Sequence, residues 1–275
     1  MTPYRGLFIN LAQSEARRNA LLSSLSVAGI SAWYTHVPAI DGKGQAANLA
    51  TQLDAGELGL WLTHEKIVEE FSGSAEHLHI LEDDVVVAKE AKRLLPMALE
   101  SADRNFGDWD LLFTETFVPF ELFETYRQRM QVFHQRARIA YLDLASCYAS
   151  CMTSFFLNRN SIEKYAGLIR DKWSVGIPID LFLRRLLRKR ELRALVTVPF
   201  LSSISAENDQ SNIRGELDMS RRVYDVFRRG FFIDADLNAL VQEMGRLTGG
   251  AAVSALTQLY LSGYAFYRSD RYVSF

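Results

Sequence analysis

The sequence is poor in cysteine and has no long apolar run, and both absences narrow its class. It holds two cysteines, Cys147 and Cys151, and no further cysteine or nearby histidine that would complete a zinc set with them. Two thiols do not make the disulfide framework of a small secreted protein, so we expect free thiols in a reducing cytoplasm. No stretch reaches the roughly 18 uninterrupted apolar residues of a membrane span, and Arg5 and Asn10 interrupt the apolar run that a signal peptide needs. These features predict a cytoplasmic protein.

The charges lack a dominant sign, and the glycine-rich phosphate-binding signatures are missing. The formal net charge is −2 at pH 7, and 48% of the residues are hydrophobic. This balance is typical of a globular protein with no overall attraction to nucleic acid, so no nucleic-acid partner is expected. The sequence contains neither G-x-G-x-x-G after the first strand nor G-x-x-x-x-G-K-[ST], which removes the main support for a Rossmann or P-loop nucleotide site. The 275 residues fit one large domain or one domain with an appendage.

Strand-like and helix-like segments alternate along the chain. Residues 4–11 and 31–40 are predicted strands on either side of a helix that Ser14 caps and Gly29 ends. Residues 43–54 are a predicted loop, and the tail from Met219 is predicted to be helical. The alternation predicts an α/β protein with a mainly parallel central sheet and a helical C-terminal segment. Further strands are expected at 79–87, 109–114, 137–143, 152–158 and 195–204, and further helices at 55–71, from 89 with a kink or restart at Pro96, at 115–136, at 160–172 and from 178.

Three consecutive carboxylates interrupt the predicted strand at 79–87. Glu82, Asp83 and Asp84 follow a buried apolar run, and three adjacent anions repel one another unless a cation or several donors compensate them. Because side chains alternate along a strand, Glu82 and Asp84 are expected on one side and Asp83 on the other. Two carboxylates on one side suit a divalent metal that also holds a diphosphate. The other interpretation is an acidic turn, solvated or capping a helix.

Three more stretches occur in a characteristic order before these carboxylates: Phe8 to Leu11 with Arg17-Arg18, then Ala39-Ile40-Asp41-Gly42, then Gly56 to His64. Together with Glu82-Asp83-Asp84 they resemble the signature of family 25 glycosyltransferases, the lipopolysaccharide galactosyltransferase-like and collagen galactosyltransferase-like enzymes. Weaker matches follow at Ile177-Pro178-Ile179-Asp180 and Asp209-Gln210-Ser211. The resemblance covers roughly residues 4–215 and leaves the rest of the chain unaccounted for. It implies a GT-A type nucleotide-sugar-binding domain over residues 1–215, with residues 216–275 as a helical extension packed on it.

The resemblance also implies an activity. This is a metal-dependent, inverting transfer of a sugar, galactose first, from a UDP-sugar to a saccharide hydroxyl of lipopolysaccharide or another surface glycan. Mn²⁺ or Mg²⁺ would be the cofactor, with Glu82 and Asp84 as metal ligands. The alternatives are a non-catalytic glycan- or nucleotide-binding module that kept the fold, and a metal phosphohydrolase. The acidic strand lacks the D-x-D-x order of haloacid dehalogenase-like phosphohydrolases.

Several polar residues are candidates for holding the donor. Asn10 ends the first strand, where a base or ribose would lie in such a sheet. Arg17 or Arg18 could reach a diphosphate, since a guanidinium fork suits phosphate oxygens, although both could equally be solvated helix surface. By resemblance Asp41 lies near the uridine, and its other interpretation is an Asp-Gly turn. The candidate donor-binding set is Asn10, Arg17, Asp41, Glu82, Asp83, Gln210 and Ser211.

Asp180 is the candidate catalytic base. It stands in the first turn of a predicted helix, where the helix dipole favours a carboxylate and where Arg184 could pair with it. The family carries an aspartate at the matching place, and an inverting transferase needs a base that deprotonates the acceptor. Glu207 and Asp209 remain competitors for this role.

Histidines contribute little to the predicted site. All five lie at or before position 134, so a late histidine ligand is missing, and Asp209 or Asn208 would have to substitute. His64 lies on the apolar stripe of its helix and is interpreted as a core histidine, with a role in orienting the carboxylate loop as the alternative.

Basic runs at Arg184 to Arg190, Arg221-Arg222 and Arg228-Arg229 suggest a further contact. Each is either the solvated face of a helix or part of a surface for an anionic acceptor or a lipid surface, with peripheral membrane contact. The apolar tail from Ala251 to Phe266 is too interrupted to span a membrane and is interpreted as a core or dimer helix.

Overall fold

The structure is a computed structural model. It describes residues 4–46, 49, 51–118, 122–136, 138–145, 147–148, 150–205, 210–211, 215–216 and 219–247, and of 210–211, 215–216 and 219–221 it describes the backbone. The predicted helix between Ala251 and Phe266 therefore lies outside the described residues.

A central sheet organises the described part of the chain, with seven strands in the order β2-β1-β3-β7-β5-β8-β6. Five strands run in one direction, and β7 and β6 run against them, because β7 pairs antiparallel with β3 and β5 and β6 pairs antiparallel with β8. The predicted α/β class with a mainly parallel sheet is confirmed. The strands are β1 (Tyr4–Asn10), β2 (Tyr34–Pro38), β3 (His77–Glu82), β5 (Leu111–Phe113), β6 (Ala140–Asp143), β7 (Ser154–Leu157) and β8 (Ala194–Val198).

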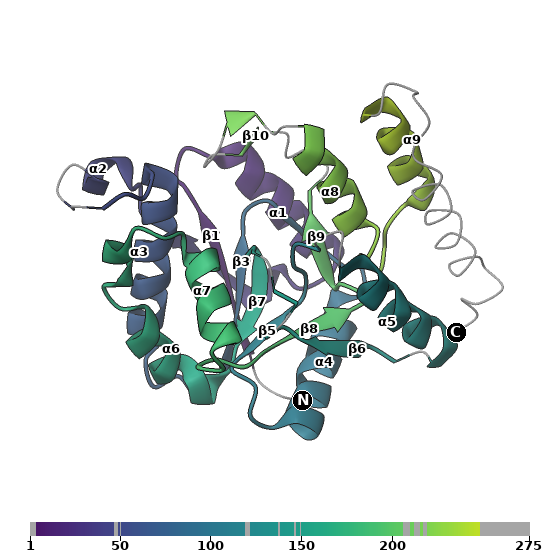
Figure 1. The fold of residues 1–275 in the computed structure, drawn as a ribbon, viewed down its shortest axis with the longest axis horizontal. Helices are drawn as coiled ribbons and strands as arrows, with labels where there is room; N and C mark the ends of the chain where they lie inside the picture. Colours follow the sequence, from purple (N-terminus) through teal and green to yellow (C-terminus); the bar gives the residue numbers. More distant parts are fainter. Residues whose placement is uncertain are drawn as a thin grey trace.

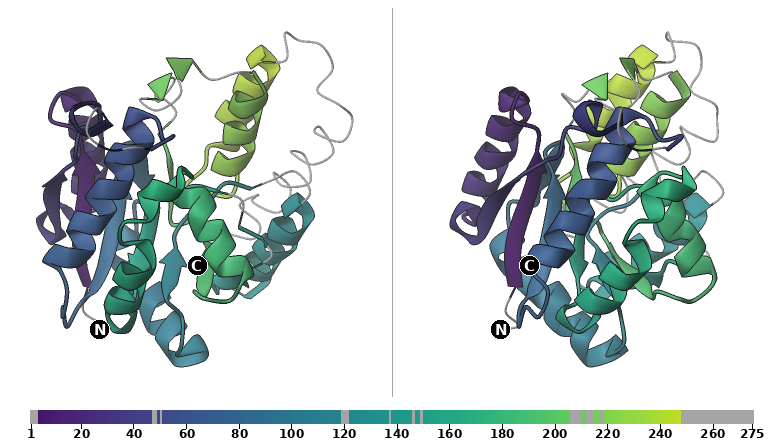
Figure 2. Two further views of the ribbon diagram at one scale, coloured as in Figure 1. Left: turned by 60° about the vertical axis from the view of Figure 1, so that its left-hand side comes forward. Right: turned by 90° about the vertical axis from the view of Figure 1, so that its left-hand side faces the viewer.

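Helices cover both faces of this sheet (Figures 1 and 2). One face packs against α3 (Ala55–Glu70), α6 (Ile162–Ile169) and α7 (Ile179–Arg188), and the other against α1 (Glu15–Val27) and α4 (Ala91–Phe106). Alternate residues of each strand enter different cores, as the pleat requires: Leu7 and Ile9 join the first core, and Phe8 joins the second. Apolar side chains on both faces explain why the strands are continuous apolar runs in the sequence.

The structure corrects several expected element boundaries. The segment at 31–40 begins with a 3₁₀ turn, Ser31–Trp33, and the loop at 43–54 contains a short helix, α2 (Lys43–Ala46). Helix α4 continues through the buried Pro96, which stands in its second turn, so the expected restart was wrong. The predicted helix at 115–136 is shorter than expected: α5 is Phe123–Arg136, and residues 115–118 after β5 are neither helix nor strand.

The predicted strand at 195–204 is two strands in two sheets. β8 ends at Val198, Pro199 interrupts the ladder, and β9 (Ser202–Ile204) pairs antiparallel with β4 (Val85–Val87). In the chain, β4 follows directly after the carboxylates, so Asp83 and Asp84 lie in a turn between β3 and β4. The carboxylate turn is therefore fixed on both sides by strands.

Helices α8 (Met219–Arg229) and α9 (Leu237–Leu247) follow, and they pack on each other through Val226, Phe227, Leu240 and Met244. Phe227 meets Phe123 of α5 edge to face, which joins α8 to the body of the molecule. The division of the chain at residue 215 stays a prediction. Within the described residues, no helix is both long and apolar enough to cross a membrane.

Candidate active site

A pocket opens where β1, β2 and β3 end. These three strands are parallel, so the residues that follow them meet at one edge of the sheet. The pocket has a volume of about 230 Å³, and its walls come from the ends of β1 and β3, the start of α1, the loop after β2 and the first turns of α3. The candidate residues that line it are Asn10, Arg17, Asp41, Glu82, Asp83 and Asp84.

Arg17 binds the carboxylate turn. Its guanidinium forms an ion pair with Asp83 and lies 3.5 Å from an oxygen of Asp84. The amide of Asn10 donates to Asp83 at 2.6 Å and to the carbonyl of Ser14 at 3.0 Å. Arg17 contacts both aspartates, so Asp83 and Asp84 do not point to opposite sides as the alternation of side chains along a strand had predicted. That alternation ends with the strand at Glu82. Asn10 is buried, so its amide group orders the acidic turn in addition to lining the pocket.

Glu82 lies in the least favourable position for a negative charge. Burial raises the pKa of Glu82 well above its usual value, and the charges of Asp84, Asp83 and Asp180 raise it further, against the opposing effect of Arg17. Burial also raises the pKa of Asp83, while Arg17 and the Asn10 amide oppose that rise. Among the described residues, Arg17 is the guanidinium that the structure pairs with these carboxylates, and further positive charge at the pocket would relieve their repulsion.

These carboxylates fit a divalent cation. Carboxylate oxygens are the ligands that Mg²⁺ and Mn²⁺ prefer, and Glu82 and Asp84 both line the pocket. Among the residues that the structure describes, no group of three or more His, Cys, Asp or Glu side chains is arranged to hold a metal. The remaining coordination positions would belong to diphosphate oxygens and water.

The loop after β2 closes the opposite wall. Asp41 is exposed at the pocket, and its carboxylate accepts from the Lys43 amide at 3.0 Å, so it is both a turn former and a pocket residue. A Cβ atom at Gly42 would overlap the Ala55 carbonyl oxygen, and one at Gly59 would overlap that of Ile40. Only glycine permits this close approach of loop and helix.

His64 is a core histidine, as its apolar stripe indicates. Its ring stacks on Phe155, and neither ring nitrogen has a hydrogen-bond partner among the described residues. Burial lowers the pKa of His64 to about 4. Among the described residues, no hydrogen bond of His64 supports its alternative role of orienting the carboxylate turn.

Asp180 stands in the first turn of α7 and is turned toward the sheet. Its carboxylate accepts from the amide of Leu181 at 2.7 Å and from the amide of Cys151 at 3.3 Å. Residues 151–153 link Asp180 to Glu82, because the Cys151 amide donates to Asp180 and the Thr153 carbonyl accepts from the Glu82 amide at 2.8 Å. Within the described part of the chain it forms no ion pair with Arg184, so that expected contact was wrong; its oxygens accept from the two backbone amides instead.

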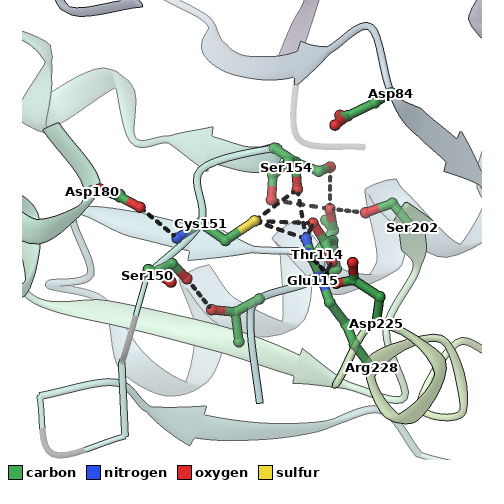
Figure 3. A network of polar contacts seen from close by, with 12 residues as sticks. Asp84, Thr114, Glu115, Ser150, Cys151, Ser154, Asp180, Ser202, Asp225 and Arg228 are labelled. Carbon is green, nitrogen blue, oxygen red and sulfur yellow. Dashed lines mark hydrogen bonds and ion pairs between the residues drawn. The ribbon is translucent and has the colours of Figure 1, made fainter. Parts of the chain in front are cut away.

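A second polar network lies beside Asp180 (Figure 3). It corrects the prediction for Arg228, which is buried against Glu115 and belongs neither to a solvated helix face nor to an anion-binding surface. Glu115 follows β5, is fully buried, and forms a two-pronged ion pair with Arg228 of α8. Arg228 also donates to the sulfur of Cys151 at 2.7 Å and to the hydroxyl of Thr153 at 3.1 Å. An acidic residue directly after a buried strand is the same signal that singled out Glu82, and it could have identified Glu115.

The remaining candidates are placed in part. Gln210 and Ser211 form β10, which pairs with β11 (Gly215–Glu216). Figures 1 and 2 show β10 at the end of the molecule where β1 and β3 end. Glu207, Asn208 and Asp209 lie outside the described residues. Their suggested roles as base or metal ligand stay predictions.

No family model matches the chain, and no curated protein matches it. Among solved structures, the apo form of mouse xyloside xylosyltransferase 1 is similar, with 11% sequence identity and a TM-score of 0.40 over 70% of this chain and 84% of that chain. A likeness this distant carries no argument about activity.

Proposed function

We propose that the protein is a metal-dependent, inverting glycosyltransferase of the family 25 type. It would transfer galactose from UDP-galactose to a saccharide hydroxyl of lipopolysaccharide or another surface glycan. The observation that carries the proposal is the convergence of Arg17, Asp41 and the three carboxylates on one pocket, with Asp180 linked to Glu82 through residues 151–153. The motifs that resemble family 25 supply the donor and the acceptor class.

Each group has a task in this reaction. Asp180 takes the proton of the acceptor hydroxyl, whose oxygen attacks the anomeric carbon while the bond to UDP breaks and the diphosphate keeps the electron pair. Arg17 supplies positive charge at the pocket, and Asp41 is placed for the nucleoside end of the donor. Glu82 and Asp84 would hold Mn²⁺ or Mg²⁺, which when bound neutralises the charge that develops on the leaving diphosphate.

The surface of α7 supports an anionic acceptor. Its apolar face is buried through Ile179, Leu183, Leu186 and Leu187, and its outer face carries Arg184, Arg185, Arg188 and Lys189. In the described residues the three arginines form no ion pair, and Lys189 approaches Glu191 only to 3.7 Å. A cationic face next to Asp180 suits a phosphorylated saccharide or an anionic lipid surface.

Turnover of UDP-galactose tests the proposal. Release of UDP should require Mn²⁺ or Mg²⁺ and should exceed that from UDP-glucose or UDP-N-acetylglucosamine. Asp84→Asn should nearly abolish cation-dependent donor binding in calorimetry, because it removes a ligand charge, while Glu100→Gln on the exposed face of α4 is the matched control. Unchanged donor affinity in Asp84→Asn would remove the metal assignment.

The same experiment decides the alternative. A binding module that kept the fold would bind UDP-galactose without releasing UDP under any cation. For the acceptor, changing Arg184, Arg188 and Lys189 to Gln should weaken binding to anionic acceptors and spare UDP release with water as acceptor. The defect should shrink as salt is added, since salt screens exposed charges.

A further inference from the structure

The buried pair Glu115–Arg228 connects two distant parts of the chain at the candidate site. The two residues are 113 positions apart, and the ion pair holds α8 against the end of β5. Burial raises the pKa of Glu115, and the guanidinium of Arg228 opposes that rise. A buried ion pair contributes little to stability compared with apolar packing, so its presence calls for a second reason.

The same guanidinium holds Cys151. The sulfur lies 2.7 Å from Nη2 of Arg228, 3.2 Å from the hydroxyl of Thr153 and 3.6 Å from Oε1 of Glu115. Burial raises the pKa of this thiol well above its usual value, so at neutral pH it is a thiol and can donate to Glu115. The side chain of Cys151 is thus held from three sides.

The backbone of Cys151 has an unusual conformation that this network keeps in place. Its φ is 87°, a region that residues with a Cβ rarely adopt, and such conformations persist only where the surroundings enforce them. Its carbonyl accepts from the Tyr148 hydroxyl at 2.9 Å. In this conformation its amide points at Asp180 and donates to Oδ2 at 3.3 Å (Figure 3).

We propose that Cys151 is a positioning residue for Asp180 and that the Glu115–Arg228 pair fixes Cys151, which makes α8 a working part of the active site. The role of Asp180 in this inference rests on the proposed function. The linkage runs from α8 through Arg228 to the sulfur, and from the Cys151 amide to the carboxylate. Glu115, Cys151 and Arg228 do not line the donor pocket, so a change at Cys151 is expected to act first on Asp180; the network meets the pocket where the Thr153 carbonyl accepts from the Glu82 amide at 2.8 Å.

The variant Cys151→Gly separates positioning from folding. Glycine adopts a positive φ without strain and keeps the amide, but it loses the sulfur that Arg228 holds. We expect a melting temperature at or above that of the wild type, unchanged calorimetric affinity for UDP with Mn²⁺, and a kcat for UDP release lower by about 10- to 100-fold. Cys151→Ser keeps an acceptor for the guanidinium and should restore most of kcat.

The matched control is Asp171→Gly. Asp171 also has a positive φ, 58°, but it lies outside the network, so this variant relieves the same kind of strain and should keep the wild-type kcat. Wild-type kcat in Cys151→Gly would overturn the inference. So would a loss of kcat that is matched by an equal loss of UDP affinity, because that would show general damage.

Amide hydrogen exchange at residue 151 tests the linkage without any turnover. The amide should be protected in the wild type, and in Cys151→Gly its exchange should rise about tenfold or more while β3 and β7 keep their protection. Retained protection would overturn the linkage. If the wild type releases no UDP from any UDP-sugar, the proposed function is wrong. Normal turnover in Cys151→Gly would contradict only the positioning role of Cys151.

Discussion

Two acidic clusters lie at the same edge of the sheet, and they differ in charge balance. At the end of β3, Glu82, Asp83 and Asp84 face the single guanidinium of Arg17, and this group opens onto the pocket. At the end of β5, Glu115 forms a two-pronged ion pair with Arg228, both side chains are buried, and Asp225 lies 3.9 Å from the same guanidinium. Among the described residues, the first cluster places three carboxylates around one guanidinium at a surface that solvent reaches, whereas the second is buried around Arg228.

This difference assigns them different tasks. A balanced, fully hydrogen-bonded pair offers nothing to a ligand, but it fixes the elements that carry it. An unbalanced cluster at a pocket is costly without a cation, which is the condition under which a protein binds one. Asp180 is connected to both: it accepts from the amide of Cys151, whose sulfur Arg228 holds, and the carbonyl of Thr153, two residues further on, accepts from the amide of Glu82.

The largest effect on kcat is expected for Asp180→Asn. This variant tests whether Asp180 is the base or a metal-site group of the cluster at the end of β3. As the base it should lose about 10²- to 10⁴-fold in kcat for UDP release, with donor and Mn²⁺ affinity unchanged. Stability should fall by under about 1 kcal/mol, because asparagine can still accept one of the two amides. Steady-state kinetics and calorimetry decide this. A loss of Mn²⁺ affinity would place Asp180 with the open cluster as a metal-site group, and near-normal turnover would move the base to Glu207 or Asp209.

Removing the cation of each cluster should have unequal costs. Arg228→Met leaves Glu115 charged and buried, so it should destabilise the protein by about 3–5 kcal/mol, and adding Glu115→Gln should recover much of this. Arg17→Met should cost about 1 kcal/mol or less, because the side chain of Arg17 is 24% exposed and solvent screens a partly exposed pair. Denaturant unfolding at pH 7 measures both. Equal losses would mean that the two clusters do not differ as described.

The sheet was predictable from the sequence because its signal is local. Continuous apolar runs such as 77–82 reflect burial on both faces, and the helices between them show their own periodicity. The apolar run at 195–204 was misinterpreted because it continues through Pro199, and only the change of partner from β5 to β4 divides it. That change is a tertiary event, so no local pattern encodes it.

The part of the candidate site that lies at the ends of parallel strands was predictable from the sequence. Asn10, Asp41 and the carboxylates follow parallel strands, so topology alone brings them to one pocket. Glu115 and Arg228 were missed because their contact spans more than a hundred residues and joins a strand end to a helix of the C-terminal segment. The contact of Asp180 was mistaken in the same way: Arg184 is near in sequence, while Cys151 is near in space.

The sharpest test of the cluster at the end of β3 is Glu82→Gln, whose effect vanishes at low pH. The fold raises the pKa of Glu82 above its unfolded value of 4.5, through burial first and then Asp84 and Asp83. Above pH 4.5 the folded state therefore holds a proton that the unfolded state has released, so the stabilising contribution of Glu82 is complete below that pH and declines as pH rises toward the folded pKa. The slope in this window is at most about 1.4 kcal/mol per pH unit.

Glutamine cannot ionise, so Glu82→Gln should lose this decline, and the difference in unfolding free energy between the variant and the wild type should grow with pH from about pH 4.5 upward. His64 and His79, whose pKa values burial lowers to about 4 and about 3, act with the opposite sign, since they destabilise the fold as pH falls below 6.5. Subtracting the two denaturation series cancels their contribution. Mn²⁺ supplies the matching test: it should raise the melting temperature of the wild type in proportion to the logarithm of its concentration and leave Glu82→Gln nearly unaffected. A pH-independent difference, together with equal Mn²⁺ stabilisation of both proteins, would show that Glu82 is a satisfied acid in a closed turn and that the cation binds elsewhere.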